Sequence, residues 1–257
     1  MSPTPPKRPH TTLTFAQSLD AKIAGAEGRQ LILSGEESMI MTHWMRTMHD
    51  GILIGIGTAL NDDPQLNVRK LPPPNAMSYH LPRPIIIDTY LRLPPTCKLL
   101  LNYQNKVGRR PWVVCGHVAA PSTHSRLPAD TAETRLLRKQ ALEAAGARII
   151  EIPMTPTADG IGTRLSIPSV LQTLKELGIS SVMVEGGAQI ISSFMEENTA
   201  DTLIITIAPT FVGASGVAYN CITEAGNLKY MGTMAIGKDS VFTFCHKDSN
   251  IFYQGHF

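Results

Sequence analysis

The chain has 257 residues, of which 43% are hydrophobic and 17% are charged, and its formal net charge at pH 7 is +2. These values are typical of a soluble globular protein, and the length fits one large domain or two small ones. A net charge this close to zero excludes a strong attraction to nucleic acid or to a membrane surface, so we expect neither as a partner. The sequence has no run of about 18 apolar residues that would predict a membrane-spanning helix, and its amino-terminal segment lacks the apolar stretch of a signal peptide.

The first ten residues differ in composition from the rest. Residues 1–10 contain four prolines and two basic residues, which predicts a disordered, Pro-rich basic tail followed by a single domain over 11–257. The four cysteines are widely spaced and form no C-x-x-C pair. We therefore expect reduced, structural thiols in a cytoplasmic protein, without a zinc site or a disulfide framework. These cysteines are Cys97, Cys115, Cys221 and Cys245.

Strand-like and helix-like segments alternate along the chain. In chain order, the pattern predicts a strand over 11–16, a helix over 34–48, strands over 51–56, 84–88 and 111–115, a helix over 132–145, a strand over 148–152, a helix over 168–177, a strand over 180–184, a helix over 188–196 and a strand over 201–207. This alternation predicts an α/β fold with a central, mostly parallel sheet and helices on both faces. Segments 240–245 and 250–254 predict a closing antiparallel hairpin. Loops over 70–82 and 119–130 are expected as insertions within one domain.

The predicted helix over 34–48 has a recognisable beginning. Ser34 can cap it, and Glu37 follows three residues later, as a capping box requires. His43 and His49 lie six positions apart in this region and would not share one helical face. We therefore predict no metal site there.

A glycine turn follows the predicted strand over 51–56. Its Gly55-Ile56-Gly57-Thr58 sequence is followed by a carboxylate pair and then by Arg69. The third glycine of a dinucleotide-binding fingerprint would fall at Leu60, so a standard Rossmann crossover is not predicted. A hydroxyl at Thr58 and a carboxylate at Asp62 can hold a ribose or an amide, and an arginine can hold a phosphate. A tight turn without a ligand is the alternative.

A second glycine turn, Glu185-Gly186-Gly187, joins a predicted strand to a predicted helix. Main-chain N–H groups at such a helix start form a site for the diphosphate of a cofactor, although the glycines could instead make room for close packing. Two glycine turns at strand ends favour a ligand crevice. Arg46 and Arg69 flank the first turn in sequence, with solvated surface charges as the alternative. The sequence contains no H-E-x-x-H, G-x-S-x-G or Walker A motif.

Five segments together resemble the riboflavin-biosynthesis reductase family. They are Thr14-Phe-Ala-Gln-Ser-Leu-Asp-Ala-Lys-Ile-Ala-Gly25, Ser34-Gly-Glu-Glu-Ser38, Thr42-His-Trp-Met-Arg46, Gly55–Arg69 and Val184-Glu-Gly-Gly-Ala188. The resemblance runs from about residue 11 to the carboxyl terminus. It implies a fold similar to that of dihydrofolate reductase, NADPH as the reductant and a homodimer. It also implies that a ribosylamino group on a phosphorylated pyrimidine is reduced to a ribitylamino group.

The resemblance also implies which residues form the site. The cofactor positions are Ala16, Thr58, Asp62, Thr89, Gly186, Gly187, Ala188 and Gln189, and the substrate positions are Arg46, Leu66, Arg69 and Glu185. The two arginines suit a ribose 5′-phosphate. No catalytic side chain is assigned, because the cofactor supplies the hydride. Glu185 and Asp62 are the candidates. Arg92 is a further candidate for the 2′-phosphate of the cofactor, with a surface charge as the alternative.

Two departures from the family pattern and two other functions bear on this assignment. The family commonly has glycine where this chain has Ala21, which would be strained by about 1 kcal/mol if the position needs a positive φ. The Cys/His spacing of the zinc deaminase that accompanies the bacterial reductase is missing, so only reductase activity is expected.

The alternatives are a reductase of another heterocycle, such as a pterin, and a non-catalytic NADPH-binding protein on the same fold. The paired arginines argue against an unphosphorylated pterin.

Overall fold

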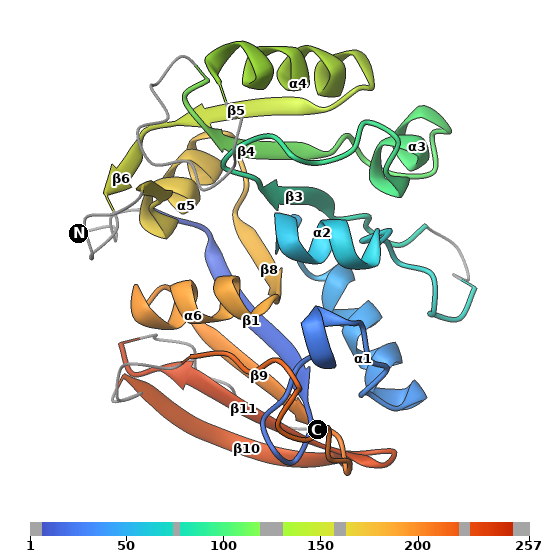
Figure 1. Cartoon of the computed structure of the whole chain (residues 1–257). Coiled ribbons are helices and arrows are strands. Elements are labelled where there is room, and N and C mark those ends of the chain that lie inside the picture. Colours follow the sequence, from blue (N-terminus) through green and yellow to red (C-terminus); the bar gives the residue numbers. More distant parts are fainter. Residues whose placement is uncertain (1–6, 74–77, 119–130, 157–162, 221–226, 249–257) are drawn as a thin grey trace, which may run out of the picture.

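The computed structural model describes residues 7–73, 78–118, 131–156, 163–220 and 227–248. One large sheet runs through it (Figure 1). Its strands are β1 (His10–Gln17), β2 (Gly51–Gly55), β3 (Arg83–Ile87), β4 (Trp112–Gly116), β5 (Arg148–Ile152), β8 (Ser181–Glu185), β9 (Thr202–Ile207), β10 (Leu228–Ile236) and β11 (Asp239–His246). A separate pair consists of β6 (Met154–Pro156) and β7 (Thr163–Leu165).

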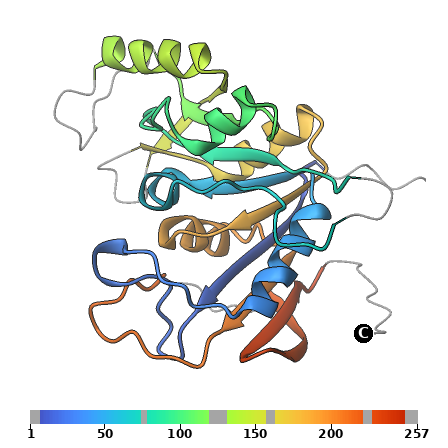
Figure 2. The same ribbon diagram turned by 90° about the vertical axis from the view of Figure 1, so that its right-hand side faces the viewer.

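The nine strands lie in the order β10-β11-β9-β1-β8-β2-β3-β4-β5. From β9 across to β5 every neighbouring pair is parallel, whereas β11 runs antiparallel to β9 and β10 antiparallel to β11. The β10–β11 hairpin therefore closes one side of the sheet, and in Figures 1 and 2 it lies at the opposite end of the molecule from α4 (Ala132–Ala144). The predicted α/β fold with a mostly parallel sheet and antiparallel carboxyl-terminal strands is confirmed.

Helices cover both faces of the sheet. Besides α4, they are α1 (Glu36–Thr47), α2 (Ile56–Asp62), α3 (Lys98–Gln104), α5 (Ile167–Glu176), α6 (Ala188–Glu196) and the short 3-10 helix η1 (Ala26–Gly28). Neighbouring residues of one strand enter different hydrophobic clusters. Leu53 of β2 packs in a cluster with residues of α5 and α6, whereas Ile52 and Ile54 pack in another with residues of α1 to α4. This two-sided cover explains why every residue of β2 is buried.

The start of α1 differs from the prediction. Gly35, and not Ser34, is the N-cap residue, and no side chain caps the helix locally, so the predicted capping box with Glu37 is wrong. The carboxylate of Asp239 in β11 instead accepts a hydrogen bond from the main-chain N–H of Gly35, with an oxygen–nitrogen distance of 2.7 Å. Asp239 is only 1% exposed. A carboxylate 204 residues away in the chain thus accepts a hydrogen bond at the start of α1, where the side chain of Ser34 or Glu37 was expected to do so.

The closing hairpin also differs from the prediction. The predicted strand over 240–245 lies within β11, but its hairpin partner is β10, which precedes it in the chain. The two strands turn at Gly237, whose φ of +56° favours glycine. The predicted partner over 250–254 lies outside the described residues. Strand β10 was missed because most of its side chains are exposed or half-buried, so its sequence lacks the apolar run of a covered strand.

The described part of the chain includes residues of the predicted tail. Strand β1 starts at His10, and Arg8 donates two hydrogen bonds to the carboxylate of Asp201, at 2.6 and 2.7 Å. A bidentate partner offsets the entropy cost of ordering this arginine. The rest of the predicted tail, residues 1–6, lies outside the described residues.

Two other expectations concern the thiols and the membrane. Three of the cysteines, Cys97, Cys115 and Cys245, are buried and free, and Cys221 lies outside the described residues. Burial raises the pKa of the Cys115 thiol to about 12, so it stays protonated. Among the described helices, none is long and apolar enough to cross a membrane.

Candidate active site

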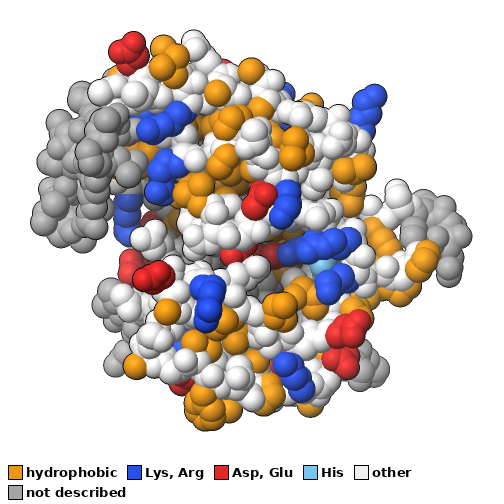
Figure 3. Space-filling model, turned by 45° about the vertical axis from the view of Figure 1, so that its right-hand side comes forward, with side chains coloured by type: hydrophobic (Ala, Val, Ile, Leu, Met, Phe, Trp, Pro, Cys, Tyr) orange, Lys and Arg blue, Asp and Glu red, His pale blue; other side chains and the backbone are white. Residues whose placement is uncertain are grey.

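The two glycine turns meet at the carboxyl edge of the sheet. Strands β2 and β8 are parallel neighbours, with Leu53 opposite Val184, so the turns that follow them emerge side by side. The hydroxyl of Thr58 donates a hydrogen bond of 3.2 Å to the carbonyl oxygen of Gly186. The predicted crevice at two adjacent strand ends therefore has a structural basis. Figure 3 shows a hollow across this side of the molecule, with Lys and Arg side chains beside it and acidic side chains within it.

The turn after β8 is shaped by its glycines. Gly186 and Gly187 have φ values of +46° and +90°, which favour glycine. A Cβ at Gly187 would lie 2.7 Å from the Thr58 hydroxyl oxygen. Gly187 is the N-cap of α6, and no side chain caps that helix, so its first N–H groups can meet an anion. Ala188 and Gln189 begin the helix. These features fit the predicted binding of a cofactor diphosphate.

The turn after β2 has both a packing role and open space. A Cβ at Gly55 would lie 2.7 Å from Ile190 of α6, whereas a Cβ at Gly57 would meet nothing within 4 Å. The first glycine therefore supports close packing, and the second leaves room beside Thr58. Asp62 ends α2, and burial raises the pKa of its carboxyl group above the ordinary value.

The other cofactor positions lie along the same edge of the sheet. Ala16 is near the end of β1, and Thr89 is the second residue after β3. The turn after β3 is held by buried Asp88, whose carboxylate accepts a hydrogen bond of 2.8 Å from the N–H of Leu93. Arg92 lies in this turn with an exposed side chain. Its position is compatible with both the 2′-phosphate assignment and a surface charge.

The substrate positions Arg46 and Glu185 form a bidentate ion pair. Nε and Nη2 of Arg46 each donate to a different carboxylate oxygen of Glu185, both at 2.6 Å, and Nη1 donates to the carbonyl oxygen of Asn67 at 2.9 Å. Both side chains are largely buried, at 10% and 17% exposure. Burial lowers the pKa of Arg46, but the charge of Glu185 outweighs it, so that the pKa lies above the ordinary value. Arg46 thus holds Glu185 at the end of β8 and also holds the loop that carries Asn67.

Arg69 lies at the rim beside this pair. Its Nη1 donates to the side-chain oxygen of Asn67 at 2.9 Å, and the side chain is exposed. Burial and then the charge of Arg46 lower the pKa of Arg69. Within the described residues, no carboxylate lies at ion-pair distance from Arg69. Of the two predicted phosphate-binding arginines, Arg69 is therefore the one with a guanidinium open to an incoming anion.

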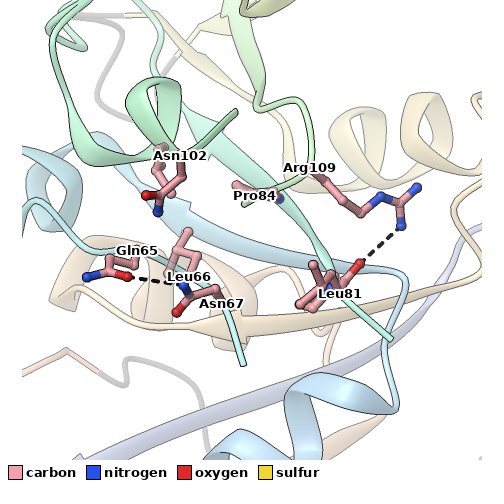
Figure 4. A pocket seen from close by; sticks show the side chains of 10 residues that line it. Gln65, Leu66, Asn67, Leu81, Pro84, Asn102 and Arg109 are labelled. Atoms are coloured by element: carbon pink, nitrogen blue, oxygen red, sulfur yellow. Dashed lines mark hydrogen bonds between the residues drawn. The ribbon is translucent and has the colours of Figure 1, made fainter. Parts of the chain in front are cut away.

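Leu66 lies deeper than Arg69. It is 3% exposed, packs in the hydrophobic cluster beneath α1 to α4, and has a φ of +44°, an unusual value for leucine. Its side chain lines a small pocket between its loop and α3 (Figure 4). The pocket is lined by Gln65, Leu66, Asn67, Leu81, Pro82, Pro84, Leu99, Asn102, Gly108 and Arg109. Sequence reasoning did not anticipate this pocket.

His43 lies beside the predicted substrate residues, although it was not predicted to lie there. It lies one helical turn before Arg46 on α1 and is fully buried. Its Nδ1 lies 3.2 Å from the main-chain nitrogen of Arg69. The spacing of three residues from Arg46 was the available signal, because residues at i and i+3 share a helical face. Among the described residues, no group of three or more His, Cys, Asp or Glu side chains could hold a metal ion.

The uncapped start of α6 thus lies directly after the Glu185 carboxylate, which is paired with Arg46, and Arg69 lies near this ion pair. The described site residues include no activated nucleophile. Such an arrangement can hold two ligands against each other, which suits transfer of a hydride from a nicotinamide cofactor.

Residues 9–242 match the model of the RibD C-terminal domain family. The 2,5-diamino-6-ribosylamino-4(3H)-pyrimidinone 5′-phosphate reductase of Debaryomyces hansenii is 37% identical over 227 residues, covering 85% of this chain and 82% of that protein. The protein of the same name from Saccharomyces cerevisiae is 36% identical over 211 residues, covering 81% of this chain and 75% of that protein.

Two solved structures share the fold. The riboflavin biosynthesis reductase Rib7 of Saccharomyces cerevisiae matches with a TM-score of 0.67 and 27% identity, over 95% of this chain and 93% of that chain. RibD of Acinetobacter baumannii matches with a TM-score of 0.71 and 27% identity, over 93% of this chain but only 58% of that chain. The family match over residues 9–242 and the fungal relatives above 30% identity lead to one conclusion: the chain belongs to the RibD C-terminal domain family.

Proposed function

We propose that this protein is the NADPH-dependent reductase that converts 2,5-diamino-6-ribosylamino-4(3H)-pyrimidinone 5′-phosphate to its ribitylamino product in riboflavin biosynthesis. The names of the fungal relatives support the substrate. The observation that carries the proposal is the arrangement at the end of β8. There, a carboxylate fixed by Arg46 stands directly before the glycine turn that begins α6.

Each part of the site has a task in this proposal. The N–H groups at the start of α6, with Gly186 and Gly187, bind the cofactor diphosphate, and Thr58 and Asp62 hold the nicotinamide half. Ala16 and Thr89 line the cofactor side, and Arg92 remains a candidate for the 2′-phosphate. The choice of NADPH over NADH rests on the family resemblance.

The substrate side binds a charged, planar molecule. Arg69 holds the ribose 5′-phosphate through its exposed guanidinium. Glu185 accepts hydrogen bonds from amino groups of the pyrimidine, and the bidentate contact with Arg46 keeps this carboxylate correctly oriented. Bound NADPH would supply a hydride to C1′ of the ring-opened imine. The protein aligns the two ligands and excludes water from the reacting atoms.

We also propose that the protein acts as a homodimer in the cytoplasm. The resemblance to the reductase family supports the homodimer, and the free, buried cysteines support the cytoplasm. Strand β10 offers one surface for the dimer, because it is an edge strand with exposed Tyr230 and Met234 at 56% and 41% exposure.

The proposal is tested by NADPH oxidation with the freshly generated ribosylaminopyrimidine 5′-phosphate. The dephosphorylated substrate, a dihydropterin and NADH would be compared under the same conditions. We expect turnover that needs the substrate phosphate and is faster with NADPH. Turnover of the pterin instead would identify a different reductase, and NADPH binding without turnover of any substrate would identify a non-catalytic binding protein.

A further inference from the structure

His43 is buried among charged groups and makes one hydrogen bond with the described part of the protein. It is 0% exposed, and its Nδ1 lies 3.2 Å from the main-chain nitrogen of Arg69. The other ring nitrogen, Nε2, is buried and has no hydrogen-bond partner in the described part of the chain. Within the described residues, the one hydrogen bond of this imidazole is therefore directed at the segment that carries Arg69.

The direction of this hydrogen bond fixes the state of the ring. A main-chain N–H can only donate, so Nδ1 must be the unprotonated acceptor, and the ring proton lies on Nε2. Burial lowers the pKa of His43 to about 4, and the charges of Arg46, Arg69 and Lys70 add to this effect against that of Glu185. His43 is consequently neutral at physiological pH and can keep accepting this bond.

The same helix holds this loop at a second point. Arg46, three residues after His43, donates to the carbonyl oxygen of Asn67 at 2.9 Å. Two side chains of α1 therefore contact the main chain at residues 67 and 69. The ion pair with Glu185 fixes one of these side chains to the end of β8.

A packing role alone does not explain why a polar imidazole, and not an apolar side chain, lies at this buried position. Leucine or methionine would fill a buried site on α1 without burying an unpaired N–H, which costs about 1–3 kcal/mol. A polar group kept at this cost is explained by what its other nitrogen does.

We propose that His43 is a positioning residue, which fixes the main chain of Arg69 so that its guanidinium meets the phosphate of the substrate. This inference rests on the proposed function, because it names the task of Arg69 in substrate binding. The His43 side chain is 0% exposed, and it acts through Arg69.

Kinetics with matched variants test the inference. His43→Leu should raise KM for the phosphorylated substrate about five- to tenfold, with kcat and NADPH affinity changed by no more than about twofold. Binding of the dephosphorylated substrate, measured as its inhibition constant against the phosphorylated one, should not change. His43→Asn places an oxygen acceptor near the Nδ1 position and should recover most of the lost affinity.

A control and a double variant separate positioning from general packing. His49, just beyond α1, is also buried, and its ring contacts Met45 and Thr12 rather than the Arg69 loop. His49→Leu should lower thermal stability without changing the preference for the phosphorylated substrate. In the Arg69→Ala background, His43→Leu should raise KM by less than about a further twofold. The reason is that the guanidinium that His43 positions is already absent. Equal effects on both forms of the substrate, or a fully additive double variant, would overturn the proposal.

Hydrogen exchange tests the same contact without any substrate. The amide of Arg69 should exchange faster in His43→Leu than in the wild type, and His43→Asn should restore its protection, while amides of β1 stay unchanged. If exchange behaves this way but no substrate is turned over, the proposed function has failed and the contact stands. If the Arg69 amide exchanges equally in all three proteins, His43 does not hold this loop and the inference is wrong.

Discussion

Replacing Ala21 by glycine should stabilise the protein. Ala21 is exposed and has a φ of 57°, so the condition under which the sequence predicts strain is met. The turn around it is held by hydrogen bonds from the N–H of Ala21 to the carbonyl of Ser18 at 3.0 Å and from the N–H of Ser18 to the carbonyl of Lys22 at 2.9 Å. The carboxylate of Asp20 adds bonds to the N–H groups of Val212 and Gly213, at 3.0 and 2.7 Å. These contacts force the alanine into the left-handed region.

The expected gain follows from two opposing effects. An L-residue in the left-handed region costs about 1–2 kcal/mol, which glycine avoids. Glycine also gives the unfolded chain more freedom, which removes about 0.4–1 kcal/mol. The free energy of unfolding should therefore rise by about 0.5–1 kcal/mol. For a chain of this size the melting temperature should rise by about 1–4 °C.

Urea denaturation and calorimetry measure this change, with Ala26→Gly as the control. Ala26 is also exposed and belongs to the same region of the chain, but it is not among the residues with positive φ. There the entropy effect acts alone, so the control should lose about 0.4–1 kcal/mol. If Ala21→Gly destabilises the protein as much as Ala26→Gly does, the left-handed strain is absent and the reasoning is refuted.

Four further predictions concern the site. Arg69→Ala should raise KM for the phosphorylated substrate by about tenfold or more, because a charge-assisted contact is lost. The affinity for NADPH should change little. If steady-state kinetics show equal losses of affinity for the substrate and for NADPH, Arg69 does not belong to the substrate side. Asp62→Ala should weaken NADPH binding in a fluorescence titration, and unchanged affinity would contradict its assignment. Glu185→Gln should lower the free energy of unfolding in urea by about 2–3 kcal/mol, because the charge of Arg46 is left unpaired in a largely buried place; a loss near zero would show that the pair contributes nothing. Unfolded His43 binds a proton near its ordinary pKa of 6.5, whereas folded His43 stays neutral down to about 4, so its contribution to stability should be lost as pH falls through this range. The slope of stability against pH should be smaller in His43→Asn, and an unchanged slope would mean that His43 does not titrate this way.

Local patterns in the sequence predicted most of the core of this fold. The helix over 188–196 matches α6 at both ends, and the apolar runs over 51–56 and 84–88 predicted β2 and β3 to within one residue at each end. Such strands are covered on both faces, so their sequences are continuously apolar. The amino-terminal start of α1 and strand β10 depend on contacts made by distant parts of the chain, and no local pattern specifies them.

In the site, too, some features follow from local sequence and others depend on contacts between distant parts of the chain. The glycine turns at Gly55 and Gly186 were visible in the sequence because each glycine stands at the end of an apolar strand. The pairing of Arg46 with Glu185, 139 residues apart, was not visible. It arises because β8 lies beside β2 in the sheet. The sequence shows that His43 shares a helical face with Arg46, but it does not show the contact of His43 with the main-chain N–H of Arg69, 26 residues away.

Transfer of deuterium from the cofactor tests the central claim most directly. NADPH labelled with deuterium at C4 of the nicotinamide, as each of the two stereoisomers, would be incubated with the protein and the ribosylaminopyrimidine 5′-phosphate. We expect one stereoisomer to yield a ribitylamino product that carries one deuterium at C1′, as read by mass spectrometry and NMR. A product without deuterium from either stereoisomer, or with the label at another carbon, would contradict hydride transfer to C1′ in this site.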